Sequence, residues 1–100
     1  MTSQYQIVLH PEAVKDLLKL DKPVQLKAKS TIAKLKIDPA TGHPLHGRLK
    51  GFRSLEFTAQ GGAYRAVYRI QEDTCVVFII GAHENIYKQA ERRVKQLKPR

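Results

Sequence analysis

The segment TCVVFIIG, residues 74–81, constrains the fold more than any other part of the sequence. It is an unbroken apolar run rich in β-branched residues, which is typical of a central strand with both faces buried. The preceding segment AYRAVYRI, residues 63–70, alternates instead, which predicts a strand lying between two different environments. One face of this strand would carry Tyr64, Ala66, Tyr68 and Ile70. The opposite face would carry Arg65, Val67 and Arg69.

Short turns connect these segments into an antiparallel meander. FRSLEFTA, residues 52–59, has the pattern of a third strand, and QGGA at 60–63 supplies two glycines that tolerate positive φ. Gln71-Glu72-Asp73 turns the chain again before the apolar run. Consecutive strands with such short connections are expected to pair with their neighbours in sequence.

Helical patterns flank the meander. A short β-prone segment at 5–9 leads into a helix within HPEAVKDLLKL, residues 10–20. Asp21-Lys22-Pro23 interrupts this helix, and a second one is expected from Pro23 to Ile37. Two helices joined by so short a break form an antiparallel hairpin. HENIYKQAERRVKQL, residues 83–97, predicts a closing helix.

The predicted fold class is α+β, with the order β-α-α-β-β-β-α in one domain over residues 1–100. The helical hairpin and the closing helix are expected to pack on the apolar face of a small, mainly antiparallel sheet. The other face is expected to stay partly open, with Arg65 and Arg69 lining it. No repeat, low-complexity segment or linker interrupts the chain.

Net charge is the most informative feature of the composition. Lys and Arg number 18 against nine Asp and Glu, so the formal charge is +9 and the isoelectric point is about 9.9. Such a balance favours a polyanionic partner, whether nucleic acid, an acidic protein or an anionic membrane. The alternative is a basic surface that serves only solubility.

Several classes of protein are disfavoured by the sequence. No apolar run approaches the about 20 residues that a membrane span needs, and the first residues lack the pattern of a signal peptide. Cys75 has no partner for an intrachain disulfide, so an inert buried thiol in the reducing cytoplasm is expected. No Cys/His spacing resembles a zinc site, and no cofactor is expected.

Histidine and arginine are the residues best suited to chemistry in this sequence. Internal cleavage of RNA needs a base for the 2′-OH, cationic donors for the crowded phosphorane oxygens and an acid for the leaving 5′-oxygen. Histidine exchanges protons near neutral pH, and arginine offers a planar fork of donors to phosphate. The candidates are His43, His46, Arg65, His83 and Tyr87.

Each candidate also has a purely structural interpretation. His43 and His46 fit an ordinary polar loop over residues 40–50, and His83 fits the region of a helix N-cap. Arg65 fits an ion pair with Glu56 on the neighbouring strand. Tyr87 fits a half-buried core position, so the residues taken singly do not decide between the interpretations.

The sequence resembles the RelE/ParE superfamily of bacterial toxins over nearly its whole length. IVLHPEAVKDLLKLDKPVQLKAK is similar to the strand and helical hairpin of that family, and PLHGRLKGFRSLEF to the segment leading into its sheet. AYRAVYRI is similar to the family's YRxxY strand, and IIGAHENIY to its closing GH…xxY segment. The last two segments, in this order and at this chain length, are the most specific.

The resemblance implies a toxin of a type II toxin–antitoxin system. RelE-like members are mRNA interferases: they enter the ribosomal A site and cut mRNA through 2′-OH attack, which stops translation and growth. ParE-like members share the fold but inhibit DNA gyrase without nuclease activity. Both are neutralised by an antitoxin whose acidic segment wraps the toxin, and they meet operator DNA only through it. A degenerate member that mainly binds antitoxin and operator is a third alternative.

The family's site residues transfer to particular positions of this sequence. Arg65 matches the strand arginine that stabilises the transition-state phosphate. His83 matches the catalytic histidine of the YoeB- and YafQ-like branches, where RelE-like toxins have arginine. Tyr87 matches the closing aromatic, which stacks on a base or assists proton transfer. His43 matches the loop base, which is histidine in YafQ-like toxins.

On the first strand of the meander, the sequence follows no single branch of the family. RelE itself has two catalytic lysines there, whereas this sequence has Ser54 and Glu56 near those positions. Glu56 also replaces the second histidine of the YafQ-like branch, as a base or only as a partner of Arg65. The residues expected to bind RNA are His46, Arg48, Lys50, Arg53 and Arg69.

Overall fold

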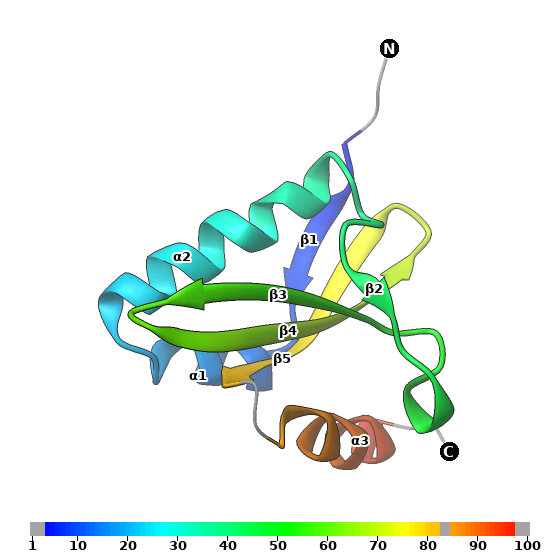
Figure 1. Ribbon diagram of the computed structural model, residues 1–100. Helices are drawn as coiled ribbons and strands as arrows, with labels where there is room; N and C mark the ends of the chain where they lie inside the picture. The colour runs from blue at the N-terminus through cyan, green and yellow to red at the C-terminus, as the bar shows by residue number, and fades with distance from the viewer. Residues whose placement is uncertain (1–3, 83–84, 98–100) are drawn as a thin grey trace.

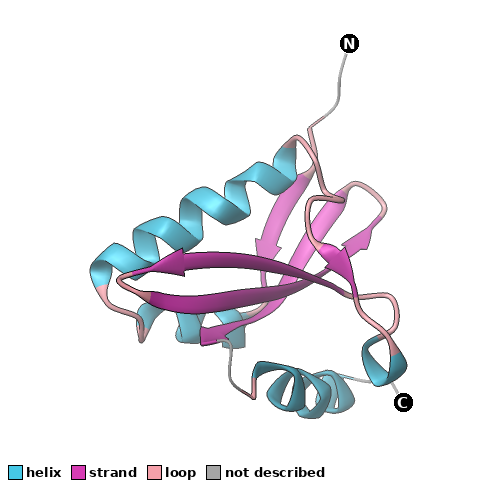
Figure 2. Ribbon diagram, viewed as in Figure 1, coloured by secondary structure: helices cyan, strands magenta, loops and turns pink. Residues whose placement is uncertain are grey.

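The computed structural model describes residues 4–82 and 85–97, which form one mixed sheet between two helical layers (Figures 1 and 2). The sheet has the order β1-β5-β4-β3-β2; β1 runs parallel to β5, and the other neighbouring pairs are antiparallel. The strands are β1 (Gln6–Leu9), β2 (His43–Pro44), β3 (Arg53–Ala59), β4 (Gly62–Gln71) and β5 (Thr74–Ala82). The helices are α1 (Pro11–Leu18), α2 (Lys22–Ala33) and α3 (Ile86–Leu97), with 3₁₀ turns η1 (Lys34–Lys36) and η2 (Gly47–Leu49).

The predicted α+β class and element order are confirmed, with small changes at the boundaries. The second helix was expected to reach Ile37, but α2 ends at Ala33 and continues as η1. The loop over 40–50 contains the two-residue strand β2, which was not predicted. None of the described helices is long and apolar enough to cross a bilayer.

The two helical layers lie on opposite faces of the sheet. Helices α1 and α2 pack against β5 and β3 on one face, whereas α3 packs against β5 and η2 on the other (Figure 1). The expectation that all helices share one face and leave the other partly open is therefore wrong for α3. The physical reason lies in β5: a strand that is apolar on both faces requires a cover on each.

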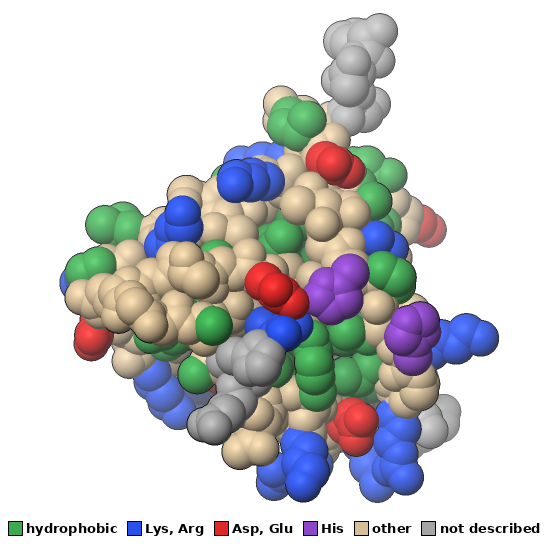
Figure 3. Space-filling view, viewed as in Figure 1, with side chains coloured by type: hydrophobic (Ala, Val, Ile, Leu, Met, Phe, Trp, Pro, Cys, Tyr) green, Lys and Arg blue, Asp and Glu red, His purple; other side chains and the backbone are tan. Residues whose placement is uncertain are grey.

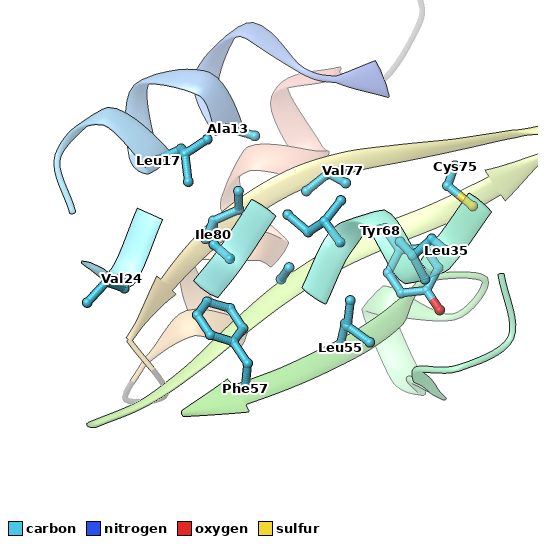
Figure 4. Close-up of a cluster of buried hydrophobic side chains, with 13 residues drawn as sticks. Ala13, Leu17, Val24, Leu35, Leu55, Phe57, Tyr68, Cys75, Val77 and Ile80 are labelled. Carbon is cyan, nitrogen blue, oxygen red and sulfur yellow. The ribbon is translucent and has the colours of Figure 1, made fainter. Parts of the chain in front are cut away.

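Two separate clusters of buried side chains result. The larger one joins the hairpin to the sheet through residues such as Leu17, Val24, Leu35, Phe57 and Tyr68, whose side chains converge in Figure 4. The smaller cluster lies under α3 and η2 and contains Leu49, Phe52, Val67, Phe78, Ile79, Ile86 and Ala90. Cys75 lies in the larger cluster, where burial raises the pKa of its thiol, as expected for an inert cysteine.

A bulge in β5 determines which of its residues enter each cluster. Val67 pairs with Ile79 and Tyr68 pairs with Val77, so Phe78 is an extra residue on β5. Because one residue is inserted, Phe78 and Ile79 both contribute to the smaller cluster, and Ile80 returns to the larger one. The bulge thus shifts which β5 residues face α3.

An ion pair closes the edge of β5 beyond the end of β1. Strand β1 ends opposite Val77, and the Ile80 N–H donates to Asp16 Oδ2 at 3.1 Å. Arg93 Nη1 donates to the same carboxylate oxygen at 2.7 Å and to the Phe78 carbonyl at 2.9 Å. One pair of side chains therefore satisfies two backbone groups of β5 and ties α1 to α3.

Tyr68 attaches the loop that precedes β2 to the centre of the sheet. Its side chain is fully buried; its hydroxyl donates to the Pro39 carbonyl at 2.6 Å and accepts from the Gly42 N–H at 3.0 Å. Burial raises the pKa of Tyr68, and the Gly42 hydrogen bond and the charge of Arg53 offset part of that rise. Folding therefore favours the neutral phenol.

We expect Tyr68→Phe to lower the free energy of unfolding by about 1–3 kcal/mol, because a buried N–H and a partly buried carbonyl lose their partner. The pH dependence has a definite sign. Above the ordinary tyrosine pKa of 10.0 the unfolded chain loses a proton that the folded chain keeps, so wild-type stability falls at alkaline pH. The variant should lose this component, and urea unfolding at neutral and alkaline pH measures both effects. Tyr64→Phe, at a half-buried position, is the control.

Candidate functional site

Arg65 and Glu56 face each other across β3 and β4. The strand register pairs the two residues directly, and Arg65 Nη1 lies 2.5 Å from Glu56 Oε2. The Arg65 side chain is only 13% exposed, whereas that of Glu56 is 52% exposed. The alternative foreseen from the sequence, a cross-strand ion pair, is thus present, and it places an anion on the candidate catalytic arginine.

Tyr87 brings α3 into this cluster. It lies in the first turn of α3, and its hydroxyl accepts a hydrogen bond from Arg65 Nη1. The same hydroxyl donates to Ser54 Oγ at 3.2 Å, and Arg65 Cζ lies 5.1 Å from the centre of the Tyr87 ring. The tyrosine therefore packs against the guanidinium as well as bonding to it.

Ser54 was named in the sequence near the family's lysine positions but was not predicted as a site residue. Its side chain is 1% exposed, and it shares a face of β3 with Glu56 because the two residues are two positions apart. That alternation was readable from the sequence. The hydrogen bond to Tyr87 was not, because it depends on where α3 packs.

His43 reaches the cluster through β2. The register places His43 opposite Ser54, and His43 Nδ1 lies 3.9 Å from Glu56 Oε2. This distance exceeds a hydrogen bond but is close enough for a charged histidine to attract the carboxylate. Both side chains are about half exposed, so both are in contact with solvent.

Gly42 allows the chain to approach the sheet closely just before His43. A Cβ at this position would lie 2.6 Å from the Ser54 carbonyl and 2.9 Å from the Tyr68 hydroxyl. No L side chain fits there without movement of the backbone. The glycine is therefore required for the pairing of β2 with β3.

A hollow of about 400 Å³ opens beside this cluster. Its lining comes from the loop, η2 and α3: His43, Pro44, Leu45, His46, Leu49, Tyr87 and Glu91. A second hollow of about 290 Å³ adjoins it between η2 and α3, lined by Arg48, Lys88, Glu91, Arg92 and Lys95. Figure 3 shows histidines on this face, with an acidic and a basic side chain beside them and further Lys and Arg side chains along its lower edge.

The remaining predicted residues are placed in different ways. Arg48 and Lys50 are exposed, and Arg48 lines the basic hollow. Arg53 donates to the carbonyls of Gly42 at 2.7 Å and Ala40 at 3.2 Å, so it holds the loop. Arg69 Cζ lies 5.1 Å and 5.5 Å from the ring centres of Phe52 and Phe78. His83 lies outside the described residues.

The described side chains form no metal centre. Across residues 4–82 and 85–97, no three His, Cys, Asp or Glu side chains come together as metal ligands would. The cluster that is present combines a guanidinium, a carboxylate, an imidazole and two hydroxyls. This set of groups can bind an anion and exchange protons.

The family model of ParE-like toxins of type II bacterial toxin–antitoxin systems matches residues 7–91. The chain belongs to this toxin family. The resemblance to RelE/ParE toxins noted in the sequence is therefore confirmed. A comparison with curated protein sequences gives no significant match.

Solved toxin structures have the same fold. A mutant of the Escherichia coli toxin RelE in the free state superposes with a TM-score of 0.74 at 21% identity, covering 95% of this chain and 99% of that chain. The toxin–antitoxin complex RelBE2 of Mycobacterium tuberculosis gives 0.66 at 29% identity, covering 80% and 99%. The YoeB/ParE toxin of Agrobacterium tumefaciens gives 0.63 at 24%, covering 78% and 98%.

We expect Gly42→Ala to separate β2 from β3, because the new methyl group meets backbone and the buried Tyr68. The toxin should lose about 1–3 kcal/mol of stability, as overpacked sites do, and the His43 ring should move away from Glu56. Urea unfolding and the NMR shifts of His43 measure the two effects. Gly62→Ala is the control, because its nearest contact is the Tyr64 ring at 3.3 Å. Unchanged His43 shifts in Gly42→Ala would contradict the assigned role of the glycine.

Proposed function

We propose that this toxin is an mRNA endonuclease that acts on translating ribosomes. The observation that carries the proposal is that Arg65, Glu56, Tyr87 and His43 form one cluster, two of whose members, Tyr87 and His43, also line the hollow. Inhibition of gyrase through a protein interface would not require a histidine, a carboxylate and a tyrosine around a half-buried arginine. Action on ribosomes would place the toxin in the cytoplasm.

The proposed reaction assigns each group a step. His43, assisted by Glu56, takes the proton from the 2′-OH, and the 2′-oxygen attacks the adjacent phosphorus. Arg65 donates to the phosphorane oxygens, where negative charge develops. The P–O5′ bond breaks, and the leaving oxygen receives a proton from Tyr87 or from His83, which family resemblance assigns to proton transfer. The products carry a 2′,3′-cyclic phosphate and a 5′-hydroxyl.

The cations around the hollow offer a path for the RNA backbone. Arg48, Lys88, Arg92 and Lys95 line the adjoining hollow, whose lining contains a single carboxylate, that of Glu91. Lys50 and His46 extend the rim on the loop side, where both are exposed. Arg53 and Arg69 are the weaker RNA-binding candidates, since their guanidinium groups already contact carbonyls and rings of the toxin itself.

A gyrase inhibitor is the second candidate, and the family description favours it, because the model that matches is named ParE-like. Such a toxin would act by binding a protein surface. Its toxicity would then be insensitive to loss of the proton-transfer groups. Primer extension and gyrase supercoiling assays on the same variants separate the two candidates.

Primer extension on a defined mRNA, with and without ribosomes, tests the nuclease. We expect wild type to cut only on ribosomes, and Arg65→Ala to slow cleavage about 100-fold or more, because a transition-state donor is lost. Tyr87→Phe and His83→Ala should also slow it. Lys29→Ala changes an exposed cation of α2 on the opposite layer and should cut normally. Intact mRNA with wild type, together with inhibited supercoiling, would establish the gyrase candidate instead.

An acidic antitoxin is the proposed regulatory partner, through which the toxin would meet operator DNA. The net charge of +9 means that the Lys and Arg side chains of the toxin repel one another. An acidic segment over the basic hollows would relieve that repulsion. RelBE2 of Mycobacterium tuberculosis, a structural relative, is a toxin–antitoxin complex.

We expect the toxin–antitoxin complex to melt well above the free toxin, and the difference between the two melting temperatures to shrink in high salt. Thermal unfolding at low and high salt, with equal protein concentrations, measures the difference. Equal melting temperatures would contradict the prediction, and a difference that does not shrink in high salt would show that the stabilisation does not depend on relief of charge repulsion.

A further inference from the structure

A carboxylate of the toxin occupies the position where the proposed reaction needs the substrate phosphate. The Glu56 carboxylate lies 2.5 Å from Arg65 Nη1. Carboxylate and phosphate oxygens are both acceptors for a guanidinium, and they use the same N–H groups. A substrate phosphate that binds Arg65 Nη1 would therefore compete with the Glu56 carboxylate for this donor.

The two partners of this ion pair are held very differently. Arg65 is mostly buried, donates to the Tyr87 hydroxyl and packs on the Tyr87 ring, so its guanidinium is fixed by α3. Glu56 is half exposed, and Arg65 is its only ion-pair partner within 3.5 Å among the described residues. An incoming anion would therefore displace the carboxylate and leave the arginine in place.

A second partner for the displaced carboxylate is already adjacent. His43 Nδ1 lies 3.9 Å from Glu56 Oε2, the same oxygen that contacts Arg65. A rotation of the exposed glutamate side chain would shorten this distance to that of a hydrogen bond. The carboxylate would then stabilise the imidazolium that forms when His43 accepts a proton.

From these contacts we infer that Glu56 is a built-in competitor of the substrate phosphate at Arg65, and that phosphate binding transfers its carboxylate from Arg65 to His43. The inference rests on the proposed function for its substrate class. It assigns Glu56 two successive positions: on the arginine in the free toxin, and on the histidine in the complex.

Titration with inorganic phosphate at constant ionic strength, followed by the NMR amide shifts of residues 56, 65 and 87, tests the exchange. Glu56→Gln should bind phosphate about fivefold more tightly than wild type, a factor near the upper end for an exposed ion pair. Glu91→Gln is the matched control, because Glu91 lines the hollow beside His43 and Tyr87 but has no hydrogen bond or ion pair to Arg65 in the described structure. It should change affinity less than about twofold.

Arg65→Ala supplies the second comparison. With the arginine absent, Glu56→Gln and Glu91→Gln should have equal effects on phosphate affinity. Each variant then only removes one negative charge from the surroundings of the phosphate. The inference is overturned if the two Gln variants behave alike in the presence of Arg65. It is also overturned if Glu56→Gln weakens phosphate binding.

Cleavage on ribosomes separates this inference from the proposed function. Tighter phosphate binding by Glu56→Gln together with uncut mRNA in wild type would support the exchange and reject the nuclease. Ribosome-dependent cleavage in wild type, with no gain in phosphate affinity in Glu56→Gln, would support the nuclease and reject the exchange.

Discussion

The ion pair between Asp16 and Arg93 connects the two helical layers of the toxin at strand β5. It joins α1, on one face of the sheet, to α3, on the other, and it satisfies backbone groups of β5 where β1 no longer accompanies it. The position of α3 decides where Tyr87 lies, and Tyr87 in turn fixes the Arg65 guanidinium. The candidate site thus depends on a contact made at the opposite edge of β5.

Much of the fold was readable from the sequence because hydrophobic patterning determines it. The alternation over 63–70 placed Tyr68 and Arg65 on opposite faces, and both assignments are correct. The unbroken apolar run over 74–81 predicted a strand buried on both faces, a pattern that is incompatible with leaving one face open. The position of α3 follows from the run itself. The bulge at Phe78 has no such signal, since every residue around it is apolar.

The candidate site was predictable where it depends on register and unpredictable where it depends on packing. A turn at Gln60-Gly61 makes Glu56 the partner of Arg65, so this pair follows from the hairpin alone. Strand β2 is two residues long and pairs through its backbone, which leaves no periodic pattern to detect. Ser54 likewise meets Tyr87 only because α3 packs on β5 and η2, from where the Tyr87 side chain reaches β3.

The side chains that attract a polyanion differ from the arginine of the candidate site. Arg65 is neutralised by Glu56 in the free toxin, so it adds little to the electrostatic field that an approaching polyanion meets. That field arises from exposed cations around the adjoining hollow, among them Arg48, Lys88 and Lys95. In the proposed exchange, a polyanion would be attracted by side chains outside the cluster, and Arg65 would become available only to an anion that reaches the cluster and displaces Glu56. Selectivity for a correctly positioned phosphate would follow from this arrangement, since an anion elsewhere on the basic surface leaves the Glu56–Arg65 pair intact.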